Sequence, residues 1–381
     1  MKISIDFKEL SKVLGYSNAV LSDKSVDEKI KNIIFLVRPE EVQIVGYNAL
    51  TFCRTRLEEP IIEGVSDSGW EFQIKASELN KIVSSYSNLY KTEVNHIDFE
   101  EDNVRIKIVV HEVAKEEADE KLSRDSTFEM ENAPILTNIS AKIKTEFPEE
   151  VSMVSCGDLN LYIDALFPLV SNDASASIGS KLNFAADYVF NISSSMSAFF
   201  VNKLSEEFQD LTLGYSSVGF LKKLCEGNET IGVAKTDKYL CIDAGSTQAF
   251  MQYNRVKINY KMYVEKKAKD LGIVLDRLYF KDVLKRMGIS SSEGKLIVGD
   301  EDITVMNDNF QQEIPLNGKK DGTEGVSIKF SIPVMEKLIL GSDSVFSNDL
   351  YIYFVPTVRG YMMYIQDKTG SWLSNAQVTK A

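Results

Sequence analysis

The chain has 381 residues, 44% of them hydrophobic, which is enough for two or three domains with sizeable cores. Its formal net charge of −13 argues against a protein held to nucleic acid or to a membrane by its overall field, but it leaves room for a local basic surface. No apolar run approaches the roughly 20 residues of a membrane helix, and the four scattered cysteines lack metal-site spacing, which is typical of reduced thiols in the cytoplasm.

The first residues predict a strand followed by a helix. Residues 2–5 alternate apolar and polar side chains, and Asp6 is a candidate N-cap for the helix that follows. We expect this helix to end at Gly15. Its apolar residues recur at three- and four-residue spacing: Phe7, Leu10, Val13 and Leu14.

β-Branched and aromatic residues dominate the next part of the chain. Residues 30–57 predict three antiparallel strands with a turn at 39–41. Further on, a hairpin turned at 101–103 is followed by a closing strand at 126–132.

A strand that leads directly into a short amphipathic helix occurs three times. The copies are FQIKASELNKIVSSY (72–86), LTLGYSSVGFLKKL (211–224) and VSIKFSIPVMEKLIL (326–340). Internal repetition of this kind indicates several copies of one domain rather than one enzyme built around one pocket. Three serines stand at equivalent places and predict helix capping: Ser77, Ser216 and Ser331.

The repeats predict three domains of the same plan. We expect domain 1 at 1–133, a linker at 134–150, domain 2 at 151–257 and domain 3 at 258–381. Each would carry two helices packed on antiparallel β-sheet, which is an α+β fold. Such sheets have open edges that must be covered or paired with a neighbour.

Motifs of enzyme chemistry are missing from the sequence. It has no phosphate-binding loop, no dinucleotide fingerprint and no HExxH, and GYSSVG at 214–219 is one residue too long for a nucleophile elbow. The two histidines, His96 and His111, fall in or beside predicted strands and are interpreted as structural. The acidic clusters at 100–103 and 299–302 coincide with predicted turns, so we predict no enzyme, no metal site and no cofactor.

Positive charge is concentrated in the six predicted helices. These segments carry nine basic and six acidic residues, a net charge of +3, which leaves −16 on the rest of the chain. The contrast has two interpretations: ordinary solvated helix faces, or one shared surface that faces a polyanion. The candidate residues for contact with such a polyanion are Lys8, Lys12, Lys81, Lys222, Lys223, Lys281, Lys285, Arg286 and Lys337.

The MKISIDFKEL opening, residues 30–57 and the triplicated unit together resemble a DNA polymerase sliding clamp of the bacterial β-clamp type, with a bacteriophage origin as one interpretation. No single motif is diagnostic; order, spacing and three-domain length carry the resemblance. It implies a homodimeric ring of six domains, joined head to tail, with sheets outside and helices lining the hole. It also implies encircled duplex DNA, a polymerase, a clamp loader and other clamp-binding-motif proteins as partners, in the cytoplasm and without a membrane.

The resemblance further implies a pocket between domains 2 and 3 for hydrophobic partner peptides. Residues 193–200 (SSSMSAFF) and the ending NAQVTKA depart from the family's usual pattern, so this pocket is expected to be altered or to serve different partners. Ordinary core packing is the alternative for each candidate. By position the candidates are Ser194, Met196, Phe199, Ile258, Met262, Tyr263, Leu373 and Val378.

The sequence therefore predicts a non-enzymatic processivity factor that tethers a polymerase to DNA. Three alternatives stay open at this point. One is a clamp-fold scaffold of different oligomeric state in transcription or repair, another is a structural protein that does not bind DNA, and the last is an enzyme with an unrecognised site.

Overall fold

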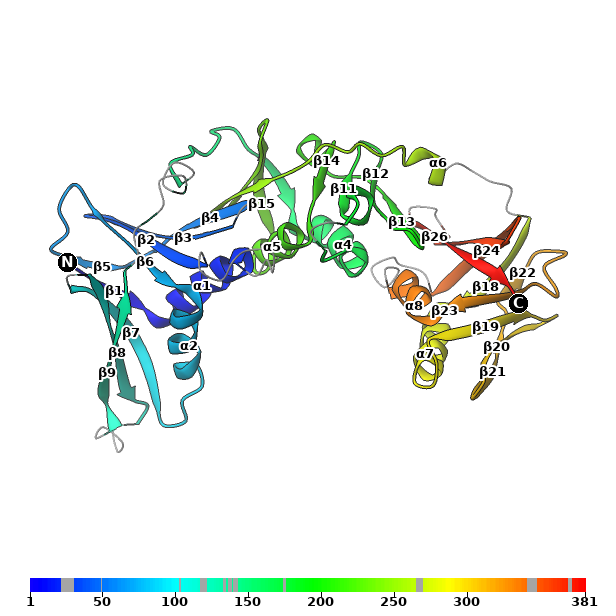
Figure 1. Ribbon diagram of the computed structural model, residues 1–381, viewed down its shortest axis with the longest axis horizontal. Coiled ribbons are helices and arrows are strands. Elements are labelled where there is room, and N and C mark those ends of the chain that lie inside the picture. The colour runs from blue at the N-terminus through cyan, green and yellow to red at the C-terminus, as the bar shows by residue number, and fades with distance from the viewer. Residues whose placement is uncertain are drawn as a thin grey trace. The chain divides into compact units, whose positions relative to one another are not determined.

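The computed structural model describes residues 1–21, 31–48, 50–102, 104–116, 122–132, 135, 139, 143–173, 176–264, 270–340, 348–368 and 372–381. The chain forms two compact units. Unit 1 comprises Met1–Cys156 and Gly219–Tyr253, and unit 2 comprises Gly157–Val218 and Asn254–Ala381. Figure 1 shows the elements of each.

The α-helices of the described residues include the six that the sequence predicts. They are α1 (Phe7–Leu21), α2 (Ala76–Tyr86), α4 (Cys156–Leu166), α5 (Tyr215–Cys225), α6 (Lys261–Val264), α7 (Arg277–Gly288) and α8 (Ile332–Leu340). Short 3-10 turns lie at Phe167–Leu169, Ile178–Ser180 and Glu206–Phe208. Helix α1 contacts α2, and α7 contacts α8.

Helix α1 is longer than predicted, because it continues through Gly15 to Leu21. A glycine inside a helix costs about 1 kcal/mol relative to alanine. Val20 and Leu21 extend the buried face of the helix beyond Gly15, and burying them offsets that cost. The prediction that Gly15 ends this helix was therefore wrong.

The predicted serine caps are not general. Ser77 is the second residue of α2, whose N-cap is Lys75 without a side-chain hydrogen bond, and Ser216 is the second residue of α5. Only Ser331 directly precedes its helix. In α2 and α5 the helix begins one residue before the serine. The serine therefore lies inside the first turn and is not the N-cap.

Unit 1 contains two antiparallel sheets. The first has the order β5-β1-β7-β8-β9, and the second has the order β10-β15-β16-β17-β4-β3-β2-β6. The strands of the first are β1 (Lys2–Asp6), β5 (Ile61–Glu63), β7 (Thr92–Asp102), β8 (Arg105–Ala114) and β9 (Arg124–Glu131). Those of the second are β2 (Asn32–Arg38), β3 (Glu41–Tyr47), β4 (Thr51–Arg56), β6 (Trp70–Lys75), β10 (Ser152–Ser155), β15 (Thr230–Lys235), β16 (Tyr239–Ala244) and β17 (Thr247–Gln252).

One large core joins these two sheets to helices α1 and α2. Phe35 and Phe72 stack with ring centroids 4.6 Å apart, and Phe99 of the other sheet lies 4.9 Å from Phe35. All three rings are fully buried. Each helix therefore turns its apolar side to the core and its polar side to solvent.

Unit 2 contains one branched antiparallel sheet of thirteen strands. Its main path is β14-β11-β12-β13-β26-β23-β19-β20-β21, and β18, β22, β24 and β25 join it through β26. The strands are β11 (Leu182–Phe184), β12 (Tyr188–Ile192), β13 (Met196–Val201), β14 (Leu211–Leu213), β18 (Leu271–Asp276), β19 (Glu293–Val298), β20 (Asp302–Asn307), β21 (Phe310–Pro315), β22 (Gly318–Lys319), β23 (Ser327–Ser331), β24 (Asp349–Thr357), β25 (Gly360–Gln366) and β26 (Trp372–Lys380). The antiparallel α+β fold class is confirmed.

Distant parts of the chain meet in both large sheets. Strand β17 pairs with β4, where the hydroxyls of Thr55 and Thr247 hydrogen-bond at 3.0 Å. Strand β13 pairs with β26, where the Ser197 hydroxyl donates to Asn375 at 2.9 Å. Each pairing joins strands that the sequence analysis assigns to different expected domains, while the domain boundaries themselves stay a prediction.

The expected linker, 134–150, is described at residue 135, at 139 and from 143 onward. Its apolar residues recur every four positions (Ile135, Ile139, Ile143 and Phe147) and pack with the core around Phe250. Arg54 adds hydrogen bonds to the carbonyl oxygens of residues 143 and 145, at 3.3 and 3.1 Å. Because strands of the expected middle domain enter both units, the three-domain division stays a prediction.

Candidate nucleic-acid interface

Two of the lysine-bearing helices begin with the same cap. The Asp6 carboxylate accepts a hydrogen bond from the Glu9 N–H, and the Asp276 carboxylate accepts one from the Tyr279 N–H, both at 2.8 Å. An acidic cap satisfies a free N–H and interacts well with the positive end of the helix dipole. The cap therefore fixes the first residue of α1 and of α7. Because side chains recur every 3.6 residues along a helix, the start also sets which residues face solvent.

Every candidate basic residue lies on a helix and is exposed or half-buried. Lys8, Lys12, Lys81, Lys285, Arg286 and Lys337 are exposed, and Lys222, Lys223 and Lys281 are half-buried. With the observed helix bounds, the six helices carry ten basic and six acidic residues. The additional basic residue is Arg277, which is buried and so adds little to a surface.

The local charge differs among these lysines. Lys8 and Lys12 share a surface hollow of about 440 Å³ with four acidic residues. One of these, Glu9, accepts a hydrogen bond from the Glu58 N–H at 2.6 Å. Lys223 forms an ion pair with Glu226, and Arg286 donates to the Asp282 carbonyl oxygen at 3.2 Å. A phosphate approaching α1 would therefore meet acids as well as lysines.

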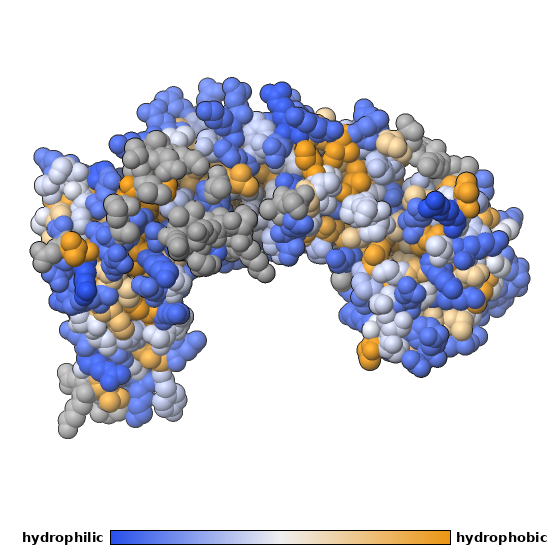
Figure 2. Space-filling view, in the orientation of Figure 1, coloured by the Kyte–Doolittle hydropathy of each residue, from blue (hydrophilic) through white to orange (hydrophobic). Residues whose placement is uncertain are grey.

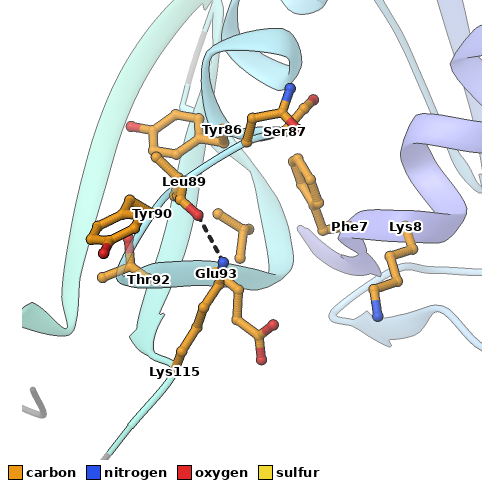
Figure 3. Close-up of a pocket in the computed structure, with 11 residues that line it drawn as sticks. Phe7, Lys8, Tyr86, Ser87, Leu89, Tyr90, Thr92, Glu93 and Lys115 are labelled. Atoms are coloured by element: carbon orange, nitrogen blue, oxygen red, sulfur yellow. Dashed lines mark hydrogen bonds between the residues drawn. The ribbon is translucent and has the colours of Figure 1, made fainter. Parts of the chain in front are cut away.

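A cavity of about 490 Å³ lies beside the first residues of α1 and the end of α2 (Figure 3). Phe7, Tyr86 and the exposed Tyr90 line it, and Lys115 donates a hydrogen bond to the Leu89 carbonyl oxygen at 2.7 Å. Lys8 is one of its lining residues. The cavity therefore combines aromatic rings with ammonium groups at the ends of two lysine-bearing helices.

A second cavity of the same volume lies in unit 2, and Lys337 of α8 lines it. Phe167 and Tyr215 form one wall, with ring centroids 4.6 Å apart. Tyr215 is 45% exposed. Lys337 is therefore placed beside an accessible aromatic pair.

The candidate peptide-pocket residues fall into two groups. Phe199 of β13 is fully buried in a cluster with Phe190 and Ile258, and the ring of Tyr263 in α6 lies 6.5 Å from it. Across the sheet, Leu373 is the register partner of Phe199. Figure 2 shows hydrophobic residues at the surface in the region of β11–β14.

The other candidates are less buried or lie elsewhere in the sheet. Met262 is 55% exposed, Ser194 is exposed, and Met196 is half-buried. Val378 is buried in β26, five residues beyond Leu373. The structure therefore brings Phe199, Ile258, Tyr263 and Leu373 together, with Met262 beside them in sequence.

The segment 256–264 covers this cluster. Tyr260 packs on Phe190 with ring centroids 4.8 Å apart, and its hydroxyl donates a hydrogen bond to Asp187. Burial and the neighbouring Asp187 carboxylate raise the pKa of Tyr260, so its hydroxyl stays a donor at neutral pH. A peptide that reached Phe199 would have to displace or join this segment.

Sequence reasoning missed one cluster of polar groups. Asp98 accepts hydrogen bonds from Lys2 at 2.7 Å and from the Nε2 side of His111 at 2.9 Å, and the His96 and His111 rings stack at 4.3 Å. Burial alone would raise the pKa of Asp98, but hydrogen bonds from Lys2, Ser4 and His111 hold it below its usual value. The turn predicted at 101–103 was wrong, because β7 continues to Asp102; that turn would have paired His96 with residue 108, whereas the observed register pairs His96 with His111.

The sequence matches no protein-family model and no curated protein sequence. The structure, by contrast, is similar over its whole length to solved bacterial sliding clamps. A DNA polymerase sliding clamp from Caulobacter crescentus has a TM-score of 0.78 at 14% identity, with 100% of both chains covered. A DNA polymerase III beta subunit from Thermotoga maritima has a TM-score of 0.77 at 14% identity, with 100% of this chain and 99% of that chain covered.

This chain has the sliding-clamp fold.

The resemblance read from the sequence is confirmed at the level of the fold. A third sliding clamp, from Pseudomonas aeruginosa and bound to griselimycin, has a TM-score of 0.76 at 12% identity, with 100% of both chains covered. Identities this low do not carry individual residues across, so the surfaces of this sliding-clamp fold have to be argued from its own side chains. Among the described residues, no helix has the length and apolar character needed to cross a membrane.

Proposed function

We propose that this protein is a DNA polymerase sliding clamp, a homodimeric ring that encircles duplex DNA and tethers a replicative polymerase. One observation carries the proposal: the clamp fold extends over the whole chain, with every candidate basic residue on a helix and exposed or half-buried. A basic helix surface can hold phosphates without reading bases. Such a clamp needs no catalytic group, because retention on DNA is topological.

Ring closure is supported by sheet edges. In the described part of the chain, β9 ends the five-stranded sheet of unit 1 and β21 ends the main path of the sheet in unit 2. An unpaired edge strand is a ready template for another strand. We propose that β9 of one copy meets β21 of the other, twice per ring, so that domain 1 joins domain 3 of the partner copy.

Ile289, directly after α7, is 87% exposed, and α7 contacts β21. An isoleucine at this position fits the same interface. Burying a large aliphatic side chain is worth about 1.5–3 kcal/mol. Ile289→Asp should therefore weaken the dimer by roughly tenfold or more while leaving the fold unchanged, as seen by native mass over a dilution series. An unchanged dimer would place the interface elsewhere.

The deciding experiment measures retention on circular and on linearised DNA after enzymatic loading, together with native mass. We expect a particle of two 42.8 kDa chains that stays on circles and leaves cut ends. Retention that ignores DNA topology would indicate a structural protein or an ordinary DNA-binding protein. A chain that stays monomeric would indicate a clamp-fold scaffold in transcription or repair.

Partner peptides are proposed to bind at the cluster around Phe199, reached from Met262 and Tyr263. Phe199→Ala should weaken a polymerase C-terminal peptide by roughly 1–3 kcal/mol. Because Phe199 is fully buried, the same change should also lower the free energy of unfolding by about 3–5 kcal/mol. Affinity alone therefore cannot distinguish a binding role of Phe199 from a structural one.

The exposed residues make the distinction. Met262→Ala and Tyr263→Ala should lower peptide affinity measurably in a fluorescence titration without changing the melting temperature. Tyr90→Ala, which truncates an exposed tyrosine of unit 1, is the matched control. Full affinity in both Met262 and Tyr263 variants would remove this cluster from the peptide site. We further propose that a clamp loader places the ring on DNA in the cytoplasm of a bacterial or phage-infected cell.

A further inference from the structure

The only two histidines of the chain face one another in the five-stranded sheet of unit 1. His96 of β7 and His111 of β8 are register partners, and their rings lie 4.3 Å apart. Asp98, two residues after His96, points to the same face of β7. One ring nitrogen from each histidine and one Asp98 oxygen all lie within 4.8 Å of one another.

The donor set is that of a divalent transition metal. We propose that His96, His111 and Asp98 form a Zn²⁺ site that joins β7 to β8. Two imidazoles and a carboxylate, with water in the fourth position, are a common Zn²⁺ ligand set. Bonds of about 2.0–2.1 Å place tetrahedral ligands roughly 3.3 Å apart. The Nε2 of His111 and Oδ2 of Asp98 are 2.9 Å apart, close to that spacing, so the side chain of His96 and the competing ammonium group of Lys2 are the groups that have to move.

Two further observations support a metal ligand set at this place. Oδ1 of Asp98 is buried and has no hydrogen-bond partner of good geometry within the described residues, although Ser4 of β1 is the register partner of Asp98 and its hydroxyl lies near the same carboxylate. On the other side of His111, Nδ1 is 2.9 Å from the Asp125 carboxylate of β9. A carboxylate that holds Nδ1 directs Nε2 toward a metal, so Asp125 acts as a positioning residue.

Lys2 is the competitor for this site. Its ammonium group lies 2.7 Å from Oδ2 of Asp98 and would have to leave when the metal binds. Glu100 offers it a second carboxylate, at 3.9 Å. The site is therefore expected to exchange a lysine ammonium for a dication.

The test uses tag-free, full-length protein at neutral pH with ZnCl₂ in a calorimetric titration and CoCl₂ in an absorption titration. We expect one ion per chain, a rise in melting temperature with Zn²⁺, and the spectrum of tetrahedral Co²⁺ without thiolate bands. His96→Gln should weaken binding at least tenfold, and Asp125→Asn by roughly 10–100-fold. Glu129→Gln, on the same strand as Asp125, is the matched control and should change nothing.

Lys2→Gln distinguishes a metal site from a cluster that only stabilises the sheet. Removing the competing ammonium group should raise Zn²⁺ affinity several-fold, even where the variant is slightly less stable. Because the chain has two histidines, their ring NMR signals should shift together as Zn²⁺ is added. No binding, binding that survives His96→Gln, or histidine signals that ignore Zn²⁺ would each overturn the proposal.

Discussion

Helices α4 and α7 bury apolar residues at the same spacing but differ in the charge of their exposed sides. Each follows a strand and buries four apolar residues at the same spacing, i, i+3, i+4 and i+7. These are Leu159, Tyr162, Ile163 and Leu166 in α4, and Phe280, Val283, Leu284 and Met287 in α7. Yet α4 carries two aspartates and no basic residue, whereas the accessible side of α7 carries Lys281, Lys285 and Arg286 with a single acid, Asp282.

The two helices show that the charge of an exposed helix side can vary in this protein while the buried side keeps the same spacing. The buried spacing alone is enough for a helix of this length to pack on its sheet. On the proposed clamp, phosphates would therefore be attracted to the exposed side of α7 and repelled by that of α4.

The largest effect is expected from reversing the charge of the basic helices. Changing Lys222, Lys223, Lys285 and Arg286 to Glu should abolish productive loading on DNA, a loss of at least about 100-fold, because phosphate attraction becomes repulsion. The measurement is polymerase stimulation on primed circular DNA, with the melting temperature as a test of folding. If stimulation survives, the DNA-facing assignment of α5 and α7 is wrong.

A matched control keeps the change in net charge the same. Lys238, Lys329, Arg359 and Lys368 are exposed and lie outside the helices, so reversing all four should leave loading close to normal. If both variants lose loading equally, the overall charge of the protein controls loading. The basic residues of the helices would then have no special role.

The second prediction makes α4 resemble α7. Changing Asp158 and Asp164, both exposed, to Lys should strengthen DNA binding roughly tenfold at 0.1 M salt and steepen the salt dependence by about two phosphate contacts. Fluorescence anisotropy of duplex DNA over a salt series measures both quantities. An unchanged slope would show that α4 does not face the DNA.

The smallest effect concerns the caps. Asp276→Ala should lower the free energy of unfolding by about 1 kcal/mol, because the Tyr279 N–H loses its partner. Asp6→Ala should cost a similar amount in α1 through the Glu9 N–H. Chemical denaturation measures these changes.

Ser77→Ala in α2 is the comparison for the caps. Because Ser77 lies inside the first turn and the N-cap of α2 makes no side-chain bond, its removal should cost less than about 0.5 kcal/mol. A cost equal to that of Asp276→Ala would restore the serine cap that the sequence predicts.

Local sequence patterns predicted much of the fold. The three strand–helix copies, the strands of 30–57 and the Asp6 cap all follow from short-range periodicity and side-chain chemistry. The error at Gly15 has a plain cause: burial of Val20 and Leu21 is a tertiary effect, and it outweighs an intrinsic preference of about 1 kcal/mol.

The candidate sites were predicted unevenly for the same reason. A lysine on the polar side of a helix stays accessible whatever the helix packs on, so the basic residues could be placed from sequence. Whether Phe199 is a surface anchor or a core residue depends on segment 256–264, which lies about 60 residues away and covers it.

Short-range patterns were enough to predict the repeated α+β units and the separation of basic helices from an acidic remainder, because each depends on neighbours within a few positions. The pairing of β17 with β4 and of β13 with β26, the burial of Phe199, and the contacts of Asp98 with Lys2 and His111 became known from the folded chain alone. Most of these contacts join residues far apart in the chain. Their free energy comes from burial and from closing sheet edges in the whole fold, which no local pattern records.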